Sequence, residues 1–337
     1  MKKPSSALII LLLYLATVPT NVIALGAFTE SWIRDFQLSR QTLSLFYLLS
    51  TFIVFLLLVG IKIRYSLKTT LLALSLCCQM LVFIPSTPIL MVALIVLQWL
   101  GQGWMVEACR ALLLQTSSKT MYGIWVGFME ATGTIGVFLC PFIFLFFMKN
   151  FTWKVVFLGL SIIYFIISIS ISSYSRINYP VPFFRLCDRK FLLTNILIYL
   201  PVFLVSGFFF HLEACCQTFR IPISMLESCT WQQGIGIVFL QIILSRFLKC
   251  THKIVYTFLT LLLISQIVWI FNLFNFNSIT YLLSTILGWS IFGLLVNVLW
   301  QFFYPQNLVL NEQKLKASVA FGFLANAIGP IVFYIFI

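Results

Sequence analysis

Long apolar stretches alternate with short polar breaks along the whole chain. A helix needs about 20 apolar residues to cross the hydrocarbon core of a bilayer, and the chain reaches or approaches this length eleven times. A transmembrane barrel would instead show alternating segments of about 10 residues. The pattern therefore predicts an all-α, polytopic membrane protein with about eleven transmembrane helices. The predicted spans are Ser6–Phe28, Thr42–Ile63, Thr69–Pro85, Ile89–Leu114, Met121–Met148, Val155–Ser172, Phe191–Leu212, Thr230–Phe247, Ile254–Leu273, Ile279–Phe303 and Ala317–Ile337.

The composition excludes a soluble protein. Hydrophobic residues make up 61% of the 337 residues and charged residues only 9%, whereas soluble domains carry about 25% charged residues. Disorder is excluded too, because 36 Phe and 9 Trp supply far more apolar surface than a solvated coil carries. The nine cysteines include no pair of C-x-x-C motifs, so we expect no metal site.

Basic residues are distributed unequally between alternate loops. With a cytoplasmic N-terminus, sixteen of the 21 Lys and Arg residues fall on the inner side and five on the outer side. Because basic residues accumulate in cytoplasmic loops, this bias predicts that the N-terminus is inside, and it accounts for the net charge of +13 without nucleic acid. The basic start followed by an apolar stretch is also typical of a secretory signal. Since ten further spans follow, we expect the first span to be retained.

The longest polar interruption, residues 172–190, separates six predicted spans from five. Such a break is typical of transporters built from two repeated halves. A faint internal similarity between the fifth and eleventh spans favours the same interpretation. We therefore expect two pseudo-repeated helical bundles, residues 1–172 and residues 191–337, joined by a cytoplasmic linker over residues 173–190.

Several short motifs occur at the positions that one transporter family gives them. Residues 28–40 read FTESWIRDFQLSR, an aromatic and charged segment that ends in F-x-L-S-R before the second span. Gly101 and Gly103 lie in the fourth span, Pro141 ends a Gly-containing stretch in the fifth, and residues 152–157 (TWKVVF) open the sixth. With these motifs the chain resembles the major facilitator superfamily of secondary transporters over nearly its whole length, in a divergent and bacterial form.

The chain departs from the family pattern at two places. The family's loop between the second and third spans carries an Asp-Arg pair and a second glycine, but here Arg64 stands at the Asp position and Leu67 at the glycine position. The family usually has twelve spans, and we expect this chain to lack the twelfth. Both departures favour an alternative to transport, a membrane scaffold or receptor derived from a transporter.

Three ionisable residues stand out inside the predicted spans, where a charge costs about 3 kcal/mol on insertion scales. Glu107 and Arg110 are one helical turn apart on the fourth span, and Glu130 lies at a similar depth on the fifth. One Arg between two carboxylates neutralises one of them and leaves the other free to exchange a proton. We interpret Glu130 and Glu107 as proton-coupling residues; the alternative is a structural ion pair that braces the two helices.

The resemblance implies that the first, fourth, seventh and tenth spans line a central path. The polar and aromatic side chains of these spans are therefore candidate substrate-binding residues: Asn21, Gln102, Arg110, Trp289 and Asn297. Arg110 favours an organic anion, and Trp289 offers a ring for stacking, although packing explains most single tryptophans in spans. His211, at the end of the seventh predicted span, is interpreted as a hydrogen-bonding cap rather than a titrating group.

Together these features predict a secondary active transporter of a small solute, with an organic anion as the favoured class. It would work by alternating access as a proton-coupled symporter or antiporter, monomeric in the lipid bilayer of a bacterial inner membrane. The alternative is a transport-inactive scaffold or receptor. With only two His and no Walker-type loop or Gly-x-Ser-x-Gly motif, we expect neither an enzyme nor an ATP-driven pump. We also expect no cofactor, no metal and no nucleic-acid partner.

Overall fold

The structure is a computed structural model. It describes residues 26–84, 89–98, 100, 101, 150–170, 175–178, 188–245, 252–303 and 308–335, with several positions between 131 and 148. The elements before residue 179 are η2 (Gly26–Phe28), α3 (Thr29–Phe36), α4 (Arg40–Val59), β1 (Ile63–Ser66), α5 (Leu67–Phe83), α8 (Trp153–Ser170) and β2 (Ser175–Asn178). Those after it are α10 (Arg189–Phe210), α11 (Leu212–Thr218), α12 (Ile223–Ser245), α13 (His252–Phe274), α14 (Ser278–Phe303) and α15 (Leu308–Tyr334).

Helices of membrane-spanning character account for most of the described chain. Five helices are long and apolar enough to cross a bilayer: Arg40–Val59, Arg189–Phe210, Lys253–Phe274, Ser278–Val296 and Lys316–Tyr334. Three shorter apolar helices, Lys68–Phe83, Ile89–Gln98 and Trp153–Ile169, coincide with further predicted spans. Large apolar side chains such as Leu76, Phe271 and Leu283 are exposed on these helices, as expected of a surface that faces lipid. The prediction of a polytopic, all-α membrane protein is confirmed.

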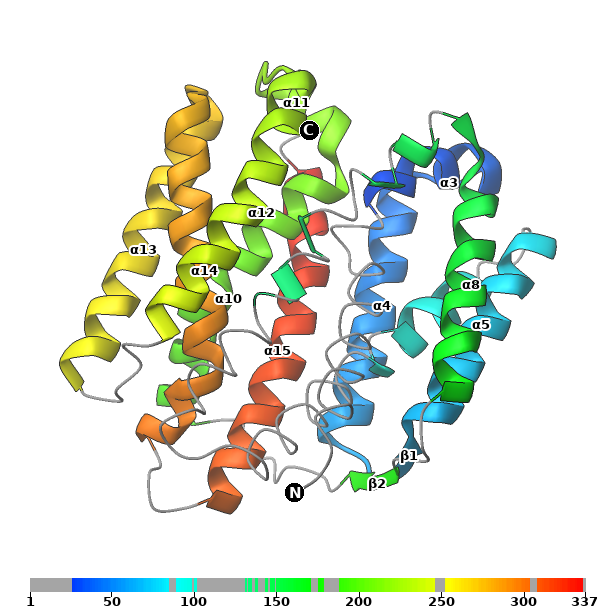
Figure 1. The fold of residues 1–337 in the computed structure, drawn as a ribbon, viewed down its shortest axis with the longest axis horizontal. Helices are drawn as coiled ribbons and strands as arrows, with labels where there is room; N and C mark the ends of the chain where they lie inside the picture. Colours follow the sequence, from blue (N-terminus) through cyan, green and yellow to red (C-terminus); the bar gives the residue numbers. More distant parts are fainter. Residues whose placement is uncertain are drawn as a thin grey trace.

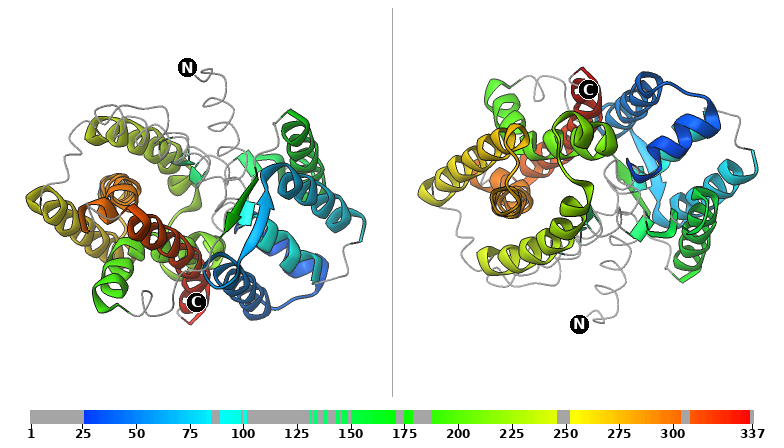
Figure 2. Two further views of the ribbon diagram at one scale, coloured as in Figure 1. Left: turned by 90° about the horizontal axis from the view of Figure 1, so that it is seen from below. Right: turned by 90° about the horizontal axis from the view of Figure 1, so that it is seen from above.

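The helices stand side by side in two groups. Figure 1 shows α4, α5 and α8 on one side and α10, α12, α13 and α14 on the other, with α15 packed between α4 and α10. The same two groups are seen end-on in Figure 2. The short helices α3 and α11 lie at one end of the molecule, the His211 end, and β1 and β2 lie at the opposite end, the Lys314 end.

Polar side chains at the loop boundaries set where the long helices begin. The Ser39 hydroxyl accepts a hydrogen bond from the Thr42 backbone N–H (3.0 Å) and so caps the first turn of α4. The Asp188 carboxylate accepts one from the Lys190 backbone N–H (3.0 Å) at the start of α10. Just before Ser39, Gln37 takes the left-handed conformation (φ 53°) that ends α3. These local signals explain why α4 and α10 begin within a few residues of the predicted spans.

Strands β1 and β2 form a small antiparallel pair that the hydropathy pattern did not predict. Ile63 lies opposite Asn178 and Ser66 lies opposite Ser175. We expected loops at both places, because strands of four residues give no periodic signal. Since β2 lies within the predicted linker, the pairing fastens this part of the linker to the connection between α4 and α5.

The α10–α15 pair is the most closely packed pair of long helices toward the His211 end. A Cβ atom at Gly329 would collide with the Phe203 carbonyl oxygen and would lie 2.6 Å from the Ser206 hydroxyl. A Cβ atom at Gly207 would lie 2.7 Å from the Gly329 carbonyl oxygen. Small residues at such positions let two helix backbones approach each other inside a membrane. The two glycines therefore fix the spacing of α10 and α15.

Candidate functional site

Most of the predicted site residues fall outside the described part of the chain. These are Asn21, Gln102, Glu107, Arg110 and Glu130. Asn297 lies on α14, but its side chain is also outside the description. Trp289 is the predicted substrate-binding residue whose side chain can be placed. The proposed grouping of Arg110 between two carboxylates therefore stays a prediction.

Trp289 lies where the two halves of the chain meet. Its ring is buried on α14 and packs edge-on against Phe138 of the predicted fifth span, with 5.2 Å between ring centroids and an interplanar angle of 88°. It also contacts Phe292 on its own helix (5.3 Å), which in turn contacts Tyr199 of α10 (5.6 Å). The side chain predicted to face a central path thus faces the other half of the molecule.

A buried hydrogen bond joins the halves close to the predicted fifth span. The Thr134 hydroxyl donates to the Gln241 side-chain oxygen of α12 at 3.1 Å, and both side chains are buried. The Gln241 amide nitrogen has no hydrogen-bond partner among the described residues. Because a polar contact inside a membrane replaces an unsatisfied group in hydrocarbon, the bond links two helices of different halves while leaving one polar atom free for another partner.

Aromatic contacts continue the junction along α4. Tyr47 packs against Phe210 of α10 (4.8 Å), and Phe55 packs against Phe321 of α15 (5.3 Å), both edge-on. We give the name seam to eight of the side chains that meet across the two halves: Tyr47, Phe55, Thr134 and Phe138 from the first half, and Phe210, Gln241, Trp289 and Phe321 from the second. The seam as described consists of ring edges and one hydrogen bond, with no ion pair among these eight residues.

At the His211 end, η2, which precedes α3, packs against the end of α10. Gly26 of η2 approaches the Phe209 backbone so closely that a Cβ atom would collide with the carbonyl oxygen. Next to it, the Arg40 guanidinium pairs with the Glu30 carboxylate at 2.6 Å. His211 is 1% exposed, and its Nε2 lies 2.9 Å from the Pro330 carbonyl oxygen of α15. The prediction that His211 forms a hydrogen-bonding cap agrees with this contact.

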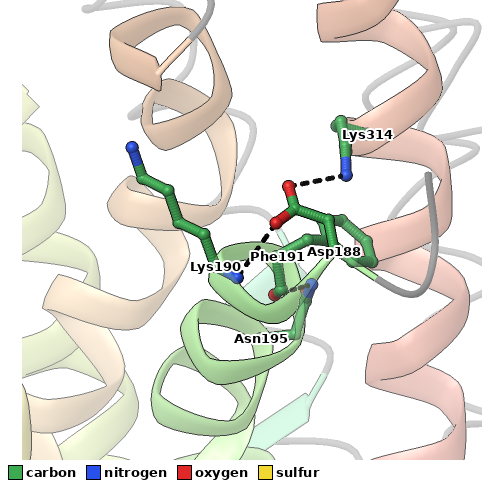
Figure 3. Close-up of polar contacts among 5 residues, drawn as sticks. All are labelled: Asp188, Lys190, Phe191, Asn195 and Lys314. Carbon is green, nitrogen blue, oxygen red and sulfur yellow. Dashed lines mark hydrogen bonds and ion pairs between the residues drawn. The ribbon is translucent and has the colours of Figure 1, made fainter. Parts of the chain in front are cut away.

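At the Lys314 end, a buried lysine joins the end of the linker to α15. Figure 3 shows Lys314 directed at the Asp188 carboxylate, with Nζ 3.3 Å from the nearer oxygen. The same ammonium lies over the Phe191 ring, 4.2 Å from its centroid. Asp188 is 37% exposed while Lys314 is 3% exposed, so the lysine is the member of the pair whose charge depends on its protein partners. Lys314 is one of the sixteen basic residues predicted on the inner side, and hydropathy alone gives no signal that it is buried.

A polar cluster lies further along the same helix pair. The Ser318 hydroxyl of α15 donates to the Asn195 side-chain oxygen at 2.6 Å, and its oxygen lies 3.3 Å from the Tyr199 hydroxyl. Asn195 in turn donates to the Phe191 carbonyl oxygen at 2.8 Å (Figure 3). All of these contacts lie within the second half of the chain. The cluster therefore fixes α10 against α15, whereas the seam joins the two halves.

The described residues contain no group of three or more His, Cys, Asp or Glu side chains that could hold a metal ion. Five cysteines, Cys77, Cys78, Cys215, Cys216 and Cys229, are buried and unbridged. Burial raises the pKa of Cys215 and of Cys216 in α11 to about 12, so both remain neutral thiols that act as small apolar residues.

No protein-family profile matches the chain, and no curated protein matches its sequence. Solved structures do match it over nearly its whole length. The human organic anion transporter MFSD10 (TETRAN) has a TM-score of 0.60 and 11% identity, covering 98% of this chain and 93% of its own. A bacterial homolog of the human lysosomal transporter Spinster, in an inward-facing and unoccupied conformation, has a TM-score of 0.65 and 12% identity, covering 98% and 82%.

At these identities the likeness establishes the fold. The chain has the fold of a major facilitator-type transporter, in agreement with the resemblance that its short motifs indicated. The structures that it matches are transporters, and its own structure is that of a multi-pass membrane protein.

Proposed function

We propose that this protein is a secondary active transporter that moves a small solute across a membrane by alternating access. The observation that carries the proposal is the match of 98% of the chain to two transporter structures. In such folds two bundles rock about a site near the membrane midplane. We assign the bundles to residues 1–172 and 191–337, with residues 173–190 as the linker.

The composition of the seam supports this mechanism. Alternating access requires that contacts between the halves break and re-form during each cycle. The described seam has edge-on aromatic pairs and the Thr134–Gln241 bond, and a side-chain hydrogen bond between membrane helices contributes only about 0.6 kcal/mol on average. Contacts of this strength can open at little cost, whereas the charged and close-packed contacts of α10 and α15 hold one half together.

An organic anion is the proposed solute, and a proton is the proposed coupling ion. Arg110 on the predicted fourth span supplies a positive charge for the anion, and Asn21, Gln102, Trp289 and Asn297 complete the proposed binding set. Glu130 and Glu107 are the proposed proton carriers. We assign the protein to a bacterial inner membrane as a monomer with its N-terminus inside, so the Lys314 end faces the cytoplasm and the His211 end faces out.

Counterflow in liposomes tests transport. Purified protein is reconstituted into vesicles loaded with one unlabelled organic anion at a time, and entry of the labelled anion is followed with and without a pH gradient. A transporter accumulates at least one label, and Glu130→Gln abolishes the response to the gradient. Trp289→Leu weakens uptake if the ring contacts solute, whereas Trp231→Leu, at a position 50% exposed on α12, leaves uptake unchanged.

A transport-inactive scaffold or receptor is the second candidate. It is favoured by Arg64 and Leu67, which stand where the family's loop carries Asp and Gly. This candidate predicts no exchange of any anion in the same vesicles, although the protein is folded. The two functions are thus separated by one assay.

A further inference from the structure

The His211 end brings a cation of the first half close to a histidine of the second. Arg40 is the first residue of α4, and His211 lies between α10 and α11, beyond the last residue of the span that ends at Phe210. Tyr47 of α4 packs against Phe210, the residue before His211, with 4.8 Å between ring centroids, and Gly26 closely approaches the Phe209 backbone. In keeping with this packing, the charge of Arg40 adds to the effect of burial in lowering the pKa of His211. Arg40 has the same effect on the pKa of Cys215, in the next turn after His211. The guanidinium is therefore positioned beside this part of the second half.

In the described part of the chain, the Arg40 guanidinium is paired through one of its nitrogens. Nη2 donates to the Glu30 carboxylate at 2.6 Å. Nη1 is buried and has no hydrogen-bond partner among the described residues. A guanidinium presents its donors in a rigid fork that matches the two oxygens of a carboxylate. The arrangement leaves a buried, charged donor directed at no acceptor in the described chain, and an unpaired donor of this kind is costly.

The imidazole of His211 has one nitrogen committed and one free. A backbone carbonyl only accepts hydrogen bonds, so Nε2, 2.9 Å from the Pro330 carbonyl oxygen, carries the proton and donates it. In the neutral ring Nδ1 is then an acceptor, and in the charged ring it becomes a second donor. Nδ1 is buried and has no hydrogen-bond partner among the described residues. The buried His211 side chain, 1% exposed, therefore has a ring nitrogen without a hydrogen-bond partner among the described residues.

We propose that Arg40 and His211 bind a carboxylate between the two halves at the outer end, with Nη1–H of Arg40 and Nδ1–H of protonated His211 each donating to one carboxylate oxygen. The role of this site in transport rests on the proposed function. In a transporter, the site would receive a carboxylate solute on its way into the protein. Because one donor belongs to α4 and the other to the end of α10, the carboxylate joins the halves. No covalent step is involved, and at a pH between the pKa values of His211 in the free and the occupied site, one proton is taken up with each anion.

The charges around His211 make anion binding depend on protonation. Burial and the charge of Arg40 lower the pKa of His211 and the hydrogen bond to Pro330 raises it, and the net result is a pKa of about 4. Among the described residues, the ionisable groups around the site include Glu30 beside Arg40, Glu213 and the neutral thiols of α11, and two tyrosines. Tyr47 packs against Phe210, and the ring centroid of Tyr334 lies 6.3 Å from that of His211. The free site is therefore neutral at His211 near pH 7. A bound carboxylate adds a negative charge that offsets Arg40 and favours the imidazolium.

A carboxylate is favoured over a spherical halide, because its two oxygens can accept separately from Nη1–H of Arg40 and from Nδ1–H of His211, while Nη2 of Arg40 stays paired with Glu30. Linkage requires that anion and proton strengthen each other's binding equally. Between the pKa values of the free and occupied site, acetate affinity should rise about tenfold for each pH unit of acidification.

The test uses the full chain in lipid nanodiscs and follows the ring nitrogens of His211 by ¹⁵N-histidine NMR. Since the chain has two histidines, a His252→Gln background leaves one signal to assign. The probe is sodium acetate, titrated at several pH values, with sodium chloride at matched ionic strength as the comparison. We expect acetate to raise the pKa of His211 by at least one unit and chloride to leave it unchanged. A pKa that acetate does not move, or that chloride moves equally, overturns the proposal.

Matched variants locate the effect. Arg40→Gln should abolish the response to acetate, and Arg34→Gln, an outer arginine whose side chain is 80% exposed, should retain it. Arg40→Lys keeps the charge without the fork and should weaken acetate binding at least fivefold. An Arg40→Gln variant that is folded and responds like the parent contradicts the proposal. If Arg40→Gln does not fold, the test uses Arg40→Lys. An Arg40→Lys variant that binds acetate as tightly as the parent protein also contradicts the proposal. The NMR experiment measures binding, and counterflow measures transport. Acetate binding without counterflow would contradict the proposed function and leave the site standing, whereas counterflow without acetate binding would contradict the site alone.

Discussion

The α10–α15 helix pair is held together differently at its two ends. Toward the His211 end, Gly207 and Gly329 bring the two backbones together. Toward the Lys314 end, polar side chains make the contact, through Ser318 with Asn195 and through Lys314 with Asp188. At the glycine end the contact depends on close backbone packing, with the His211–Pro330 hydrogen bond beyond it, whereas at the lysine end the contact is made by charges and side-chain hydrogen bonds.

The difference also separates charges that the protein pairs from charges that it leaves available. Lys314 has a carboxylate and an aromatic ring beside it (Figure 3). Arg40 and His211, at the other end, each keep one buried nitrogen that no described residue satisfies. A fully partnered charge fixes structure, while a buried polar atom left free is a candidate for a ligand. The contrast assigns a structural role to the lysine end and a binding role to the histidine end.

The largest effect is expected from removing the close approach of the two helices. Gly329→Ala should destabilise the protein by more than about 3 kcal/mol, because the new methyl group meets backbone that cannot move aside. The matched control is Gly159→Ala on α8, where a Cβ atom meets nothing within 4 Å. That substitution should be neutral or stabilising by up to about 1 kcal/mol. Thermal unfolding in detergent measures both, and equal melting temperatures for the two variants would disprove the shape argument.

The second effect concerns the charged contact at the other end. Asp188→Asn should cost about 2 kcal/mol, since asparagine caps a helix as well as aspartate does but leaves the buried ammonium of Lys314 without its carboxylate. Thermal unfolding at pH 7 provides the measurement. The exposed Arg34–Asp35 pair gives the control: Arg34→Gln should change stability by less than about 0.5 kcal/mol. A cost for Asp188→Asn no larger than for the control would mean that the buried pair contributes nothing.

A third prediction concerns pH at the histidine end. The pKa of His211 is about 4 in the folded protein, against an ordinary value of 6.5, so the unfolded chain binds the extra proton first as pH falls. Stability should therefore decline below about pH 6.5, by about 2 kcal/mol at pH 5. Thermal unfolding in carboxylate-free buffer measures this loss. His211→Gln should remove this dependence and His252→Gln should preserve it; a dependence that survives in His211→Gln must come from other groups.

The smallest effect is expected in the seam. Thr134→Val removes the bond to Gln241 and should cost about 0.6 kcal/mol. Ser161→Ala on α8 is the comparison, because Ser161 exchanges buried hydrogen bonds with Ser75 of α5, inside the first half. If the seam opens during transport, Thr134→Val should change the rate of counterflow more than Ser161→Ala does, at similar stability. A larger effect of Ser161→Ala on transport would argue against this assignment.

The spans could be predicted because a helix that crosses the lipid needs a long, nearly uninterrupted run of apolar residues. Even so, α12 begins at Ile223, seven residues before the predicted Thr230. The polar residues between Glu227 and Thr230 interrupt the apolar run, so hydropathy does not include the first turns of the helix in the span. The short helices α3 and α11 and the strands β1 and β2 were not predicted, since segments of four to eight residues have too little periodicity.

The site could be predicted only in part. Charge inside a span is visible in a sequence, and this predicts functional roles for Glu107, Arg110 and Glu130. The place of Trp289 on the tenth span predicts that it binds substrate. Thr134, Gln241 and Lys314 gave no such signal, because their importance comes from partners far away in the chain, at 107 residues for the first two. Pairing across long sequence distances is set by tertiary packing, which one sequence without its fold does not reveal.

The pairing of β1 with β2 has a consequence for how far the halves can separate. It anchors the chain at Asn178 to the first half, and the Asp188–Lys314 contact anchors it again to the second. Only nine residues, 179–187, connect these two anchors, a tether that spans at most about 36 Å when fully stretched. The length of this segment therefore limits the amplitude of any rocking motion at this end, and the limit would be relaxed if the pairing of β1 with β2 were lost.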